Sequence, residues 1–259
     1  MNIPLIEKFE SLLGTKKIPS LREKELFKKT QDFVRFIQWI PGLQMVAVSN
    51  SLAMFATHKE SDIDLFIITA PKRLWIVRTL VLFTAELLGV RVKPQKEAGR
   101  FCFPFFMTEK NLSFKGIALE NDVYLAYWIR SLKPVYNQYY TYGRFMEVNQ
   151  ALYEDILQID PSGEERATLL RENRSFLTLT RRDESARKIG LYFSQILSFT
   201  DTVFGFFSKK HLAKKINTGD TEGIIVNDNM VKLHLQDRRR EINDQIMYSN
   251  GEPLELLTE

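Results

Sequence analysis

The sequence contains one cysteine in 259 residues, Cys102, and this scarcity excludes two kinds of stabilising framework. A single thiol cannot form an internal disulfide bond, and it cannot supply a zinc site built from several cysteines. The simplest interpretation is a protein of a reducing compartment, and we expect a cytoplasmic location.

Long uncharged hydrophobic runs are also missing. The most apolar stretches are 74–90, which contains Arg78 and Glu86, and 189–207, which contains Asp201. Because a membrane-spanning helix needs about 20 consecutive apolar residues, neither stretch is expected to cross a membrane. We predict that both are helices facing the core. The N-terminus has no basic leader followed by an apolar segment, so no signal peptide is expected.

The excess of positive charge is small. A net charge of +4 allows a nucleotide or nucleic-acid partner but does not select one. With 44% hydrophobic and 26% charged residues, the composition is typical of an ordinary globular protein. The sequence shows no internal repeat and no low-complexity tract.

Hydrophobic periodicity predicts an alternation of helices and strands in the first half of the chain. The expected helices are 3–13, 21–40 and 72–88, with a short helical turn at 50–55, and the expected strands are 44–49, 62–69 and 101–108. Pro104 in the last of these favours an edge position or a bulge, because proline has no N–H to donate to a neighbouring strand. After Asp122 helical patterning dominates, with strand-like segments at 223–226 and 230–235 before a final helix.

This order of elements predicts an α+β fold, in which a small mixed sheet is flanked by helices. We divide the chain into N-terminal helices (1–42), a core (43–120) and a mainly helical C-terminal region (121–259).

Two acids in the second predicted strand indicate a metal site. Side chains alternate along a strand, so Asp62 and Asp64 share a face while Ile63 points the other way. Two carboxylates leading into a core repel each other and lose hydration, and a bound cation would relieve both costs. Hard oxygen ligands, with no cysteine in the segment, favour Mg²⁺ or Mn²⁺.

A turn upstream of these acids offers a place for phosphate. Ser49, Asn50 and Ser51 lie where a strand passes into a helix, and such turns present backbone N–H groups and hydroxyls. A phosphate cradle close to a carboxylate pair is the minimum apparatus for nucleotidyl transfer.

The Ser49–Asn50–Ser51 turn followed by Ser61–Asp62–Ile63–Asp64–Leu65 resembles the Gly-Ser and Asp-x-Asp signature of polymerase-beta-like nucleotidyltransferases. Further segments look like an uncharacterised prokaryotic branch of that superfamily: 70–75, 101–102, 108–109, 122–136, 232–234 and 237–239. The resemblance implies that Asp62 and Asp64 bind the metal and that Ser51 contacts the β- or γ-phosphate. Asn50 then occupies the place of the family's glycine, and asparagine tolerates positive φ better than most residues.

The family's third carboxylate, usually supplied by the next core strand, has no counterpart within 101–108. Glu109, directly after that strand, is the nearest candidate for a catalytic role, and Glu97 before it is another. Lys72, after the Asp-x-Asp strand, is a candidate for contacting the triphosphate. Lys232 and His234 are candidates for contacting phosphate or nucleic acid.

These features predict a metal-dependent enzyme that moves a nucleoside monophosphate from a nucleoside triphosphate to an acceptor hydroxyl, which could belong to RNA, a protein or a small molecule. The alternative is a catalytically degenerate member of the same fold that binds a nucleotide, RNA or a protein. A less favoured alternative is an interfacial membrane helix over 189–207, flanked by Lys188, Lys209 and Lys210. Membrane association is not expected.

Overall fold

The computed structural model describes residues 5–157, 172–173, 176, 194–216, 223–233 and 237–248. Its helices are α1 (Leu5–Leu13), α2 (Leu21–Ile37), α3 (Asn50–Ala53), α4 (Leu74–Leu87), α5 (Val123–Ser131), α6 (Thr141–Val148), α7 (Gln150–Leu157), α10 (Ser194–Ile216) and α11 (Arg239–Tyr248), with a 3-10 turn η1 (Glu109–Asn111). Its strands are β1 (Leu43–Val48), β2 (Ile63–Thr69), β3 (Phe101–Thr108), β4 (Lys133–Asn137), β5 (Ile224–Val226) and β6 (Met230–Leu233).

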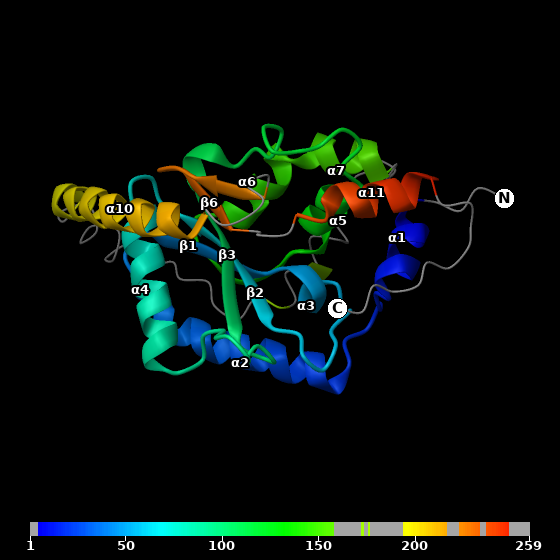
Figure 1. Ribbon diagram of the computed structural model, residues 1–259, viewed down its shortest axis with the longest axis horizontal. Coiled ribbons are helices and arrows are strands. Elements are labelled where there is room, and N and C mark those ends of the chain that lie inside the picture. Colours follow the sequence, from blue (N-terminus) through cyan, green and yellow to red (C-terminus); the bar gives the residue numbers. More distant parts are fainter. Residues whose placement is uncertain are drawn as a thin grey trace.

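The strands form one six-stranded mixed sheet in the order β4-β1-β2-β3-β6-β5. β2 and β3 run parallel, and every other neighbouring pair is antiparallel. Parallel neighbours need a crossover connection, and α4 supplies it. The predicted α+β class, a mixed sheet flanked by helices, is therefore confirmed (Figure 1).

Alternating side chains of the sheet pack into two cores, one on each face. On one face Val46, Leu65 and Ile67 pack with α2 and α4. On the other, Ala47 and Phe66 pack with the helices that Figure 1 shows above the sheet, including α5, α6 and α7. The strand period of two thus separates the layers, as expected for a sheet covered on both sides.

Pro104 lies at a bulge in β3. Asp64 is opposite Cys102 but Phe66 is opposite Phe105, so β3 has one more residue than β2 in this interval. The predicted bulge is confirmed. The edge position is wrong, because β3 lies between β2 and β6. β6 pairs only with the part of β3 from Phe105 to Met107, so its ladder needs no N–H from residue 104.

After Asp122 the sequence pattern predicted mainly helices, but Lys133–Asn137 forms a strand, β4. Pro134, within it, is compatible with a strand here because β4 is at the edge of the sheet. The strand-like segments near residues 223 and 230 and the final helix are confirmed as β5, β6 and α11.

α10 packs on α4 through a narrow stripe. The backbone N–H of Ile76 donates to the Asp201 carboxylate at 2.8 Å, and Gly205 lies against the Trp75 indole. Phe199 and Phe206 remain 71% and 64% exposed. The expectation that this helix faces the core is therefore wrong for much of its surface, because only one side of α10 meets α4. Residues 189–193 of the predicted segment lie outside the described residues.

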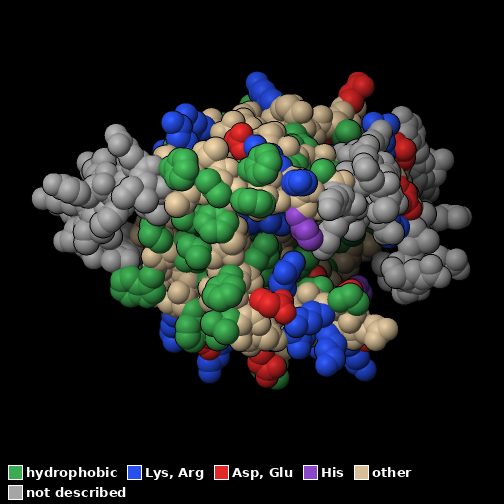
Figure 2. All heavy atoms as spheres, turned by 60° about the vertical axis from the view of Figure 1, so that its left-hand side comes forward, with side chains coloured by type: hydrophobic (Ala, Val, Ile, Leu, Met, Phe, Trp, Pro, Cys, Tyr) green, Lys and Arg blue, Asp and Glu red, His purple; other side chains and the backbone are tan. Residues whose placement is uncertain are grey.

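Figure 2 brings the α4–α10 side of the molecule forward and shows hydrophobic side chains gathered over this face. Among the residues that the structure describes, no helix combines the length and the hydrophobicity needed to cross a membrane.

We expect Gly205→Ala to destabilise the protein by about 1–3 kcal/mol, the usual cost of overpacking. A Cβ at this position would lie 2.6 Å from Trp75 Cδ1, and the indole cannot easily withdraw because its Nε1 donates to Asp228 at 2.8 Å. Urea unfolding measures the effect. Gly116→Ala is the control, since a Cβ there meets nothing within 4 Å. Equal unfolding midpoints for both variants would contradict this packing.

Candidate functional site

The two acids of the Asp-x-Asp pattern meet the cysteine of the neighbouring strand. Asp62 directly precedes β2 and Asp64 is the second residue of that strand, and Cys102 is directly opposite Asp64 in β3. Their ligand atoms all lie within 4.8 Å of one another, and the three residues are partly buried. We call this group the carboxylate–thiol cluster.

Burial and mutual repulsion make the cluster electrostatically unfavourable. Burial, followed by the charge of Asp62, raises the pKa of Asp64 to about 7, although hydrogen bonds from Asn50 and Cys102 oppose the shift. The pKa of Asp62 is also raised, chiefly by burial. Burial and the two carboxylates raise the pKa of the Cys102 thiol, which therefore stays protonated near neutral pH and donates hydrogen bonds to the acids. A proton or a cation is needed to relieve the remaining repulsion.

The Ser49–Asn50–Ser51 turn is next to this cluster. The backbone N–H of Ser49 donates to the backbone carbonyl of Asp64 at 3.0 Å, which fixes the end of β1 against β2. Asn50 has a φ of 52°, in the left-handed region that glycine adopts most easily and that asparagine also tolerates. Its side chain hydrogen-bonds to Asp64, and its Oδ1 accepts from Trp128 Nε1 at 2.8 Å. The structure therefore brings the turn and the carboxylates together, with the Asn50 amide between Asp64 and Trp128.

The structure does not bring Glu109 or Lys72 to the cluster. β3 has eight residues, so its ends are roughly 25 Å apart at about 3.3 Å per residue, and Glu109 follows the far end. The Glu109 carboxylate instead pairs with Arg144 at 2.8 Å. Lys72 follows the corresponding end of β2, because the two strands are parallel. Neither residue can contact a metal held by Asp62 and Asp64.

Glu97, the other candidate for the third carboxylate, lies near the end of the sheet that carries Asp62 and Asp64. Its charge helps to raise the pKa of Asp62, which places it in the neighbourhood of the cluster. It is not a member of the cluster, and within the described part of the chain Cys102 alone joins the two aspartates. Sequence reasoning missed Cys102 because the position of β3 beside β2 depends on a register that no local pattern reveals.

A cavity of about 210 Å³ adjoins the cluster, and we call it the α5–α11 cavity. Asn50 forms part of its wall, with Phe105 beneath and Tyr124 and Trp128 from α5. The charge of Asp64 contributes to raising the pKa of Tyr124, so the cavity and the cluster are electrostatic neighbours.

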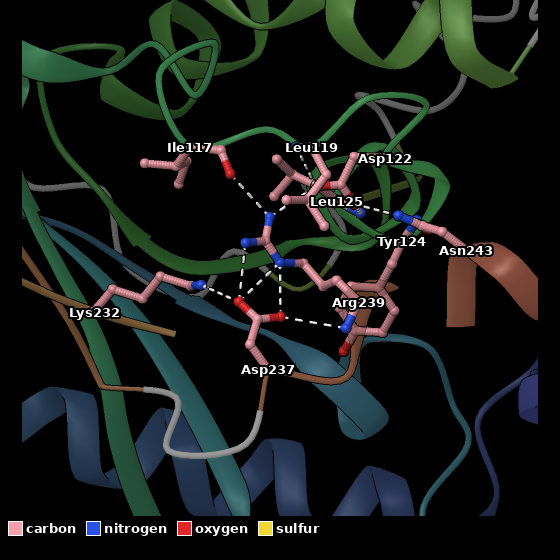
Figure 3. A network of polar contacts seen from close by, with 9 residues as sticks. All are labelled: Ile117, Leu119, Asp122, Tyr124, Leu125, Lys232, Asp237, Arg239 and Asn243. Atoms are coloured by element: carbon pink, nitrogen blue, oxygen red, sulfur yellow. Dashed lines mark hydrogen bonds and ion pairs between the residues drawn. The ribbon is translucent and has the colours of Figure 1, made fainter. Parts of the chain in front are cut away.

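A buried network of ion pairs, shown in Figure 3, contributes Lys232, Asp237 and Arg239 to the wall of this cavity. Arg239 Nη1 donates to Asp122 at 2.7 Å and to the Ile117 carbonyl at 3.0 Å, and its Nε donates to Asp237 at 2.8 Å. Lys232 Nζ donates to the same Asp237 carboxylate at 2.7 Å. Lys232, a candidate for contacting phosphate, is thus already paired with an acid, and His234 lies outside the described residues.

We expect Asp64→Asn to stabilise the metal-free protein at pH 8. The folded-state pKa of Asp64, about 7, is above its ordinary value of 3.8, so the folded protein loses stability as the pH rises between these values. Removing the charge should increase the free energy of unfolding by up to about 4 kcal/mol at pH 8, and by less at pH 5.

Urea unfolding in EDTA at the two pH values measures this effect. Asp244→Asn, at an exposed position of α11, is the control and should change neither value. A wild type as stable as Asp64→Asn at pH 8 would show that burial and the neighbouring carboxylate do not destabilise the charged form of Asp64.

No family model matches the chain, and no curated protein matches it. Among solved structures, a chain of "Crystal structure of the toxin-antitoxin with AMP-PNP" is similar, with 16% sequence identity, a TM-score of 0.31, and coverage of 56% of this chain and 96% of that chain. A likeness at this TM-score carries no argument about this chain. The fold is therefore assigned from the sheet and its register alone.

Proposed function

We propose that the protein is a metal-dependent nucleotidyltransferase that moves a nucleoside monophosphate from a nucleoside triphosphate to an acceptor hydroxyl. The observation that carries the proposal is the pair of partly buried carboxylates, Asp62 and Asp64, held within 4.8 Å at the start of β2. Such a pair is costly without a cation. In the adjacent turn Ser49 is buried and bonded to the Asp64 carbonyl, so Asn50 and Ser51 are the residues of the turn that could contact phosphate.

The donor set fits a hard divalent ion. Asp62 and Asp64 would hold Mg²⁺ or Mn²⁺ through carboxylate oxygens, and the ion would neutralise charge on the phosphates. Cys102, with its raised pKa, would remain a thiol that orients the carboxylates by hydrogen bonding. Asn50 and Ser51 would line the phosphate side of the site.

In the proposed reaction, the acceptor oxygen forms a bond to the α-phosphorus while the bond from that phosphorus to the pyrophosphate oxygen breaks. The acceptor proton passes to a carboxylate of the pair or to water, and pyrophosphate leaves. The chain contributes by positioning the phosphates opposite the acceptor, which is the main task of a protein in phosphoryl-type transfer.

A specific observation favours a second function, a nucleotide-binding module without transferase activity. Cys102 stands opposite Asp64, on the strand from which the resembled family supplies its third carboxylate. Asn50 also places a side-chain amide beside the acids where a glycine would leave space. A site with two acids can retain metal and nucleotide binding even if transfer is slow.

We expect Asp62→Asn to weaken Mg²⁺-dependent binding of nucleoside triphosphates at least tenfold, because one of two charged metal ligands is lost. Calorimetric titration with each of the four triphosphates, with Mg²⁺ and with EDTA, measures binding. Labelled triphosphate then measures transfer to candidate acceptors. Glu109→Gln is the matched control and should bind as the wild type does, since Glu109 lies at the other end of β3. Binding that is independent of both Mg²⁺ and Asp62 would refute the proposal.

We expect Cys102→Asp to strengthen Mg²⁺ binding at least tenfold, because it adds a third carboxylate opposite Asp64. In EDTA the same variant should melt at a lower temperature than the wild type, since three acids then repel one another. Thermal unfolding with and without Mg²⁺ measures both effects, with Cys102→Ser as the uncharged control. A Cys102→Asp protein that folds but gains no stability from Mg²⁺ would show that position 102 does not face the metal.

A further inference from the structure

The α5–α11 cavity is one side chain away from the proposed metal site. Asn50 hydrogen-bonds to Asp64 on one side and to Trp128 on the other, and both Asn50 and Trp128 line the cavity. The Asn50 side chain therefore connects the cavity to the carboxylates.

The walls of the cavity suit an uncharged ring. Phe105, Tyr124 and Trp128 supply aromatic surface, and Ile117 and Ile242 supply aliphatic surface. Aromatic side chains favour flat partners, with which they gain stacking and burial energy together. Trp128 cannot easily turn away, because its Nε1 is held by Asn50 at 2.8 Å.

The charges in the wall cancel. Lys232 and Arg239, which line the cavity, are joined to Asp237 and to Asp122 behind the wall by contacts of 2.7–2.8 Å. The third cation of the lining, Arg238, pairs with Glu241 at 3.0 Å. A phosphate entering this network would have to displace a carboxylate that already satisfies its cations. The cavity therefore discriminates against the charged end of a nucleotide and leaves that end to the metal.

The volume sets the size of the occupant. The cavity has a volume of about 210 Å³. Pockets that enclose a whole drug-sized ligand begin at roughly 300 Å³. The cavity therefore has room for one ring system.

We propose that the α5–α11 cavity binds the nucleobase of the substrate nucleotide while its phosphates lie at Asp62, Asp64 and the Ser49–Ser51 turn. This inference rests on the proposed function and adds the part of the chain, α5 and α11, that holds the base. The base is preferred to a ring of the acceptor because Asn50 belongs both to the cavity and to the turn assigned to the phosphates.

The inference can be tested by replacing a residue of α11 that lines the cavity with a larger one, so that its side chain fills the cavity. Ile242→Trp should lower the Mg²⁺-dependent affinity for nucleoside triphosphates at least tenfold and leave the affinity for Mg²⁺-tripolyphosphate within twofold of wild type, because tripolyphosphate has no base. Asp244→Trp, on the exposed side of the same helix, is the matched control and should bind both ligands normally. Circular dichroism confirms folding, and Ile117→Trp fills the cavity from the opposite wall if Ile242→Trp does not fold.

Three outcomes would overturn the inference. Unchanged triphosphate affinity in a folded, filled variant would show that the base lies elsewhere. Unchanged affinity with lost transfer would assign the cavity to the acceptor. Equal weakening of both ligands would assign the cavity to the phosphates and not to the base. A wild type that binds neither triphosphate nor tripolyphosphate would instead refute the proposed function itself, which separates the two failures.

Discussion

The parallel pairing of β2 with β3 is the constraint on which the candidate site depends. Because the strands run in the same direction, their first residues share one end of the sheet, and Asp64 lies opposite Cys102. The same pairing sends Lys72 and Glu109 to the other end. A sheet with these two strands antiparallel would place Glu109 near the aspartates and Cys102 far from them. The direction of one strand thus decides which side chains can act together.

Burying the two carboxylates costs free energy of folding, and the packing of the surrounding cores offsets this cost. Partial burial of Asp62 and Asp64 disfavours both charges, and hydrogen bonds from Asn50 and Cys102 recover only part of that free energy. The cores on the two faces of the sheet supply the stability that allows such a cluster to exist. Strain of this kind concentrates where a protein binds ligands, because a site that is already satisfied has nothing to gain from binding one.

Local patterns predicted what depends on local geometry. Alternation along a strand placed Asp62 and Asp64 on one face, and the tolerance of asparagine for positive φ matches the φ of 52° at Asn50. Long-range features escaped prediction. The pairing of Cys102 with Asp64 depends on strand order, and the α5–α11 cavity depends on helices from distant parts of the chain. The sequence pattern of β4 resembles a helix, and this segment forms a strand because it pairs with β1. The division at residues 42 and 120 stays a prediction.

The carboxylate–thiol cluster and the ion-pair network of the α5–α11 cavity differ in their balance of charge, and under the proposed function this difference would determine which part of a nucleotide each one binds. Under the proposed function, the repulsion between the two carboxylates of the carboxylate–thiol cluster would be relieved by a cation, which would in turn attract phosphate oxygens. The network of Lys232, Arg239, Asp237 and Asp122, part of which lines the neighbouring cavity, is neutral and holds its own cations in place. If those lysine and arginine side chains were unpaired, they would compete with the metal for phosphate and hold the nucleotide in the wrong direction. Pairing them with acids removes the competition, so the orientation of a bound nucleotide would follow from which charges the protein leaves unsatisfied.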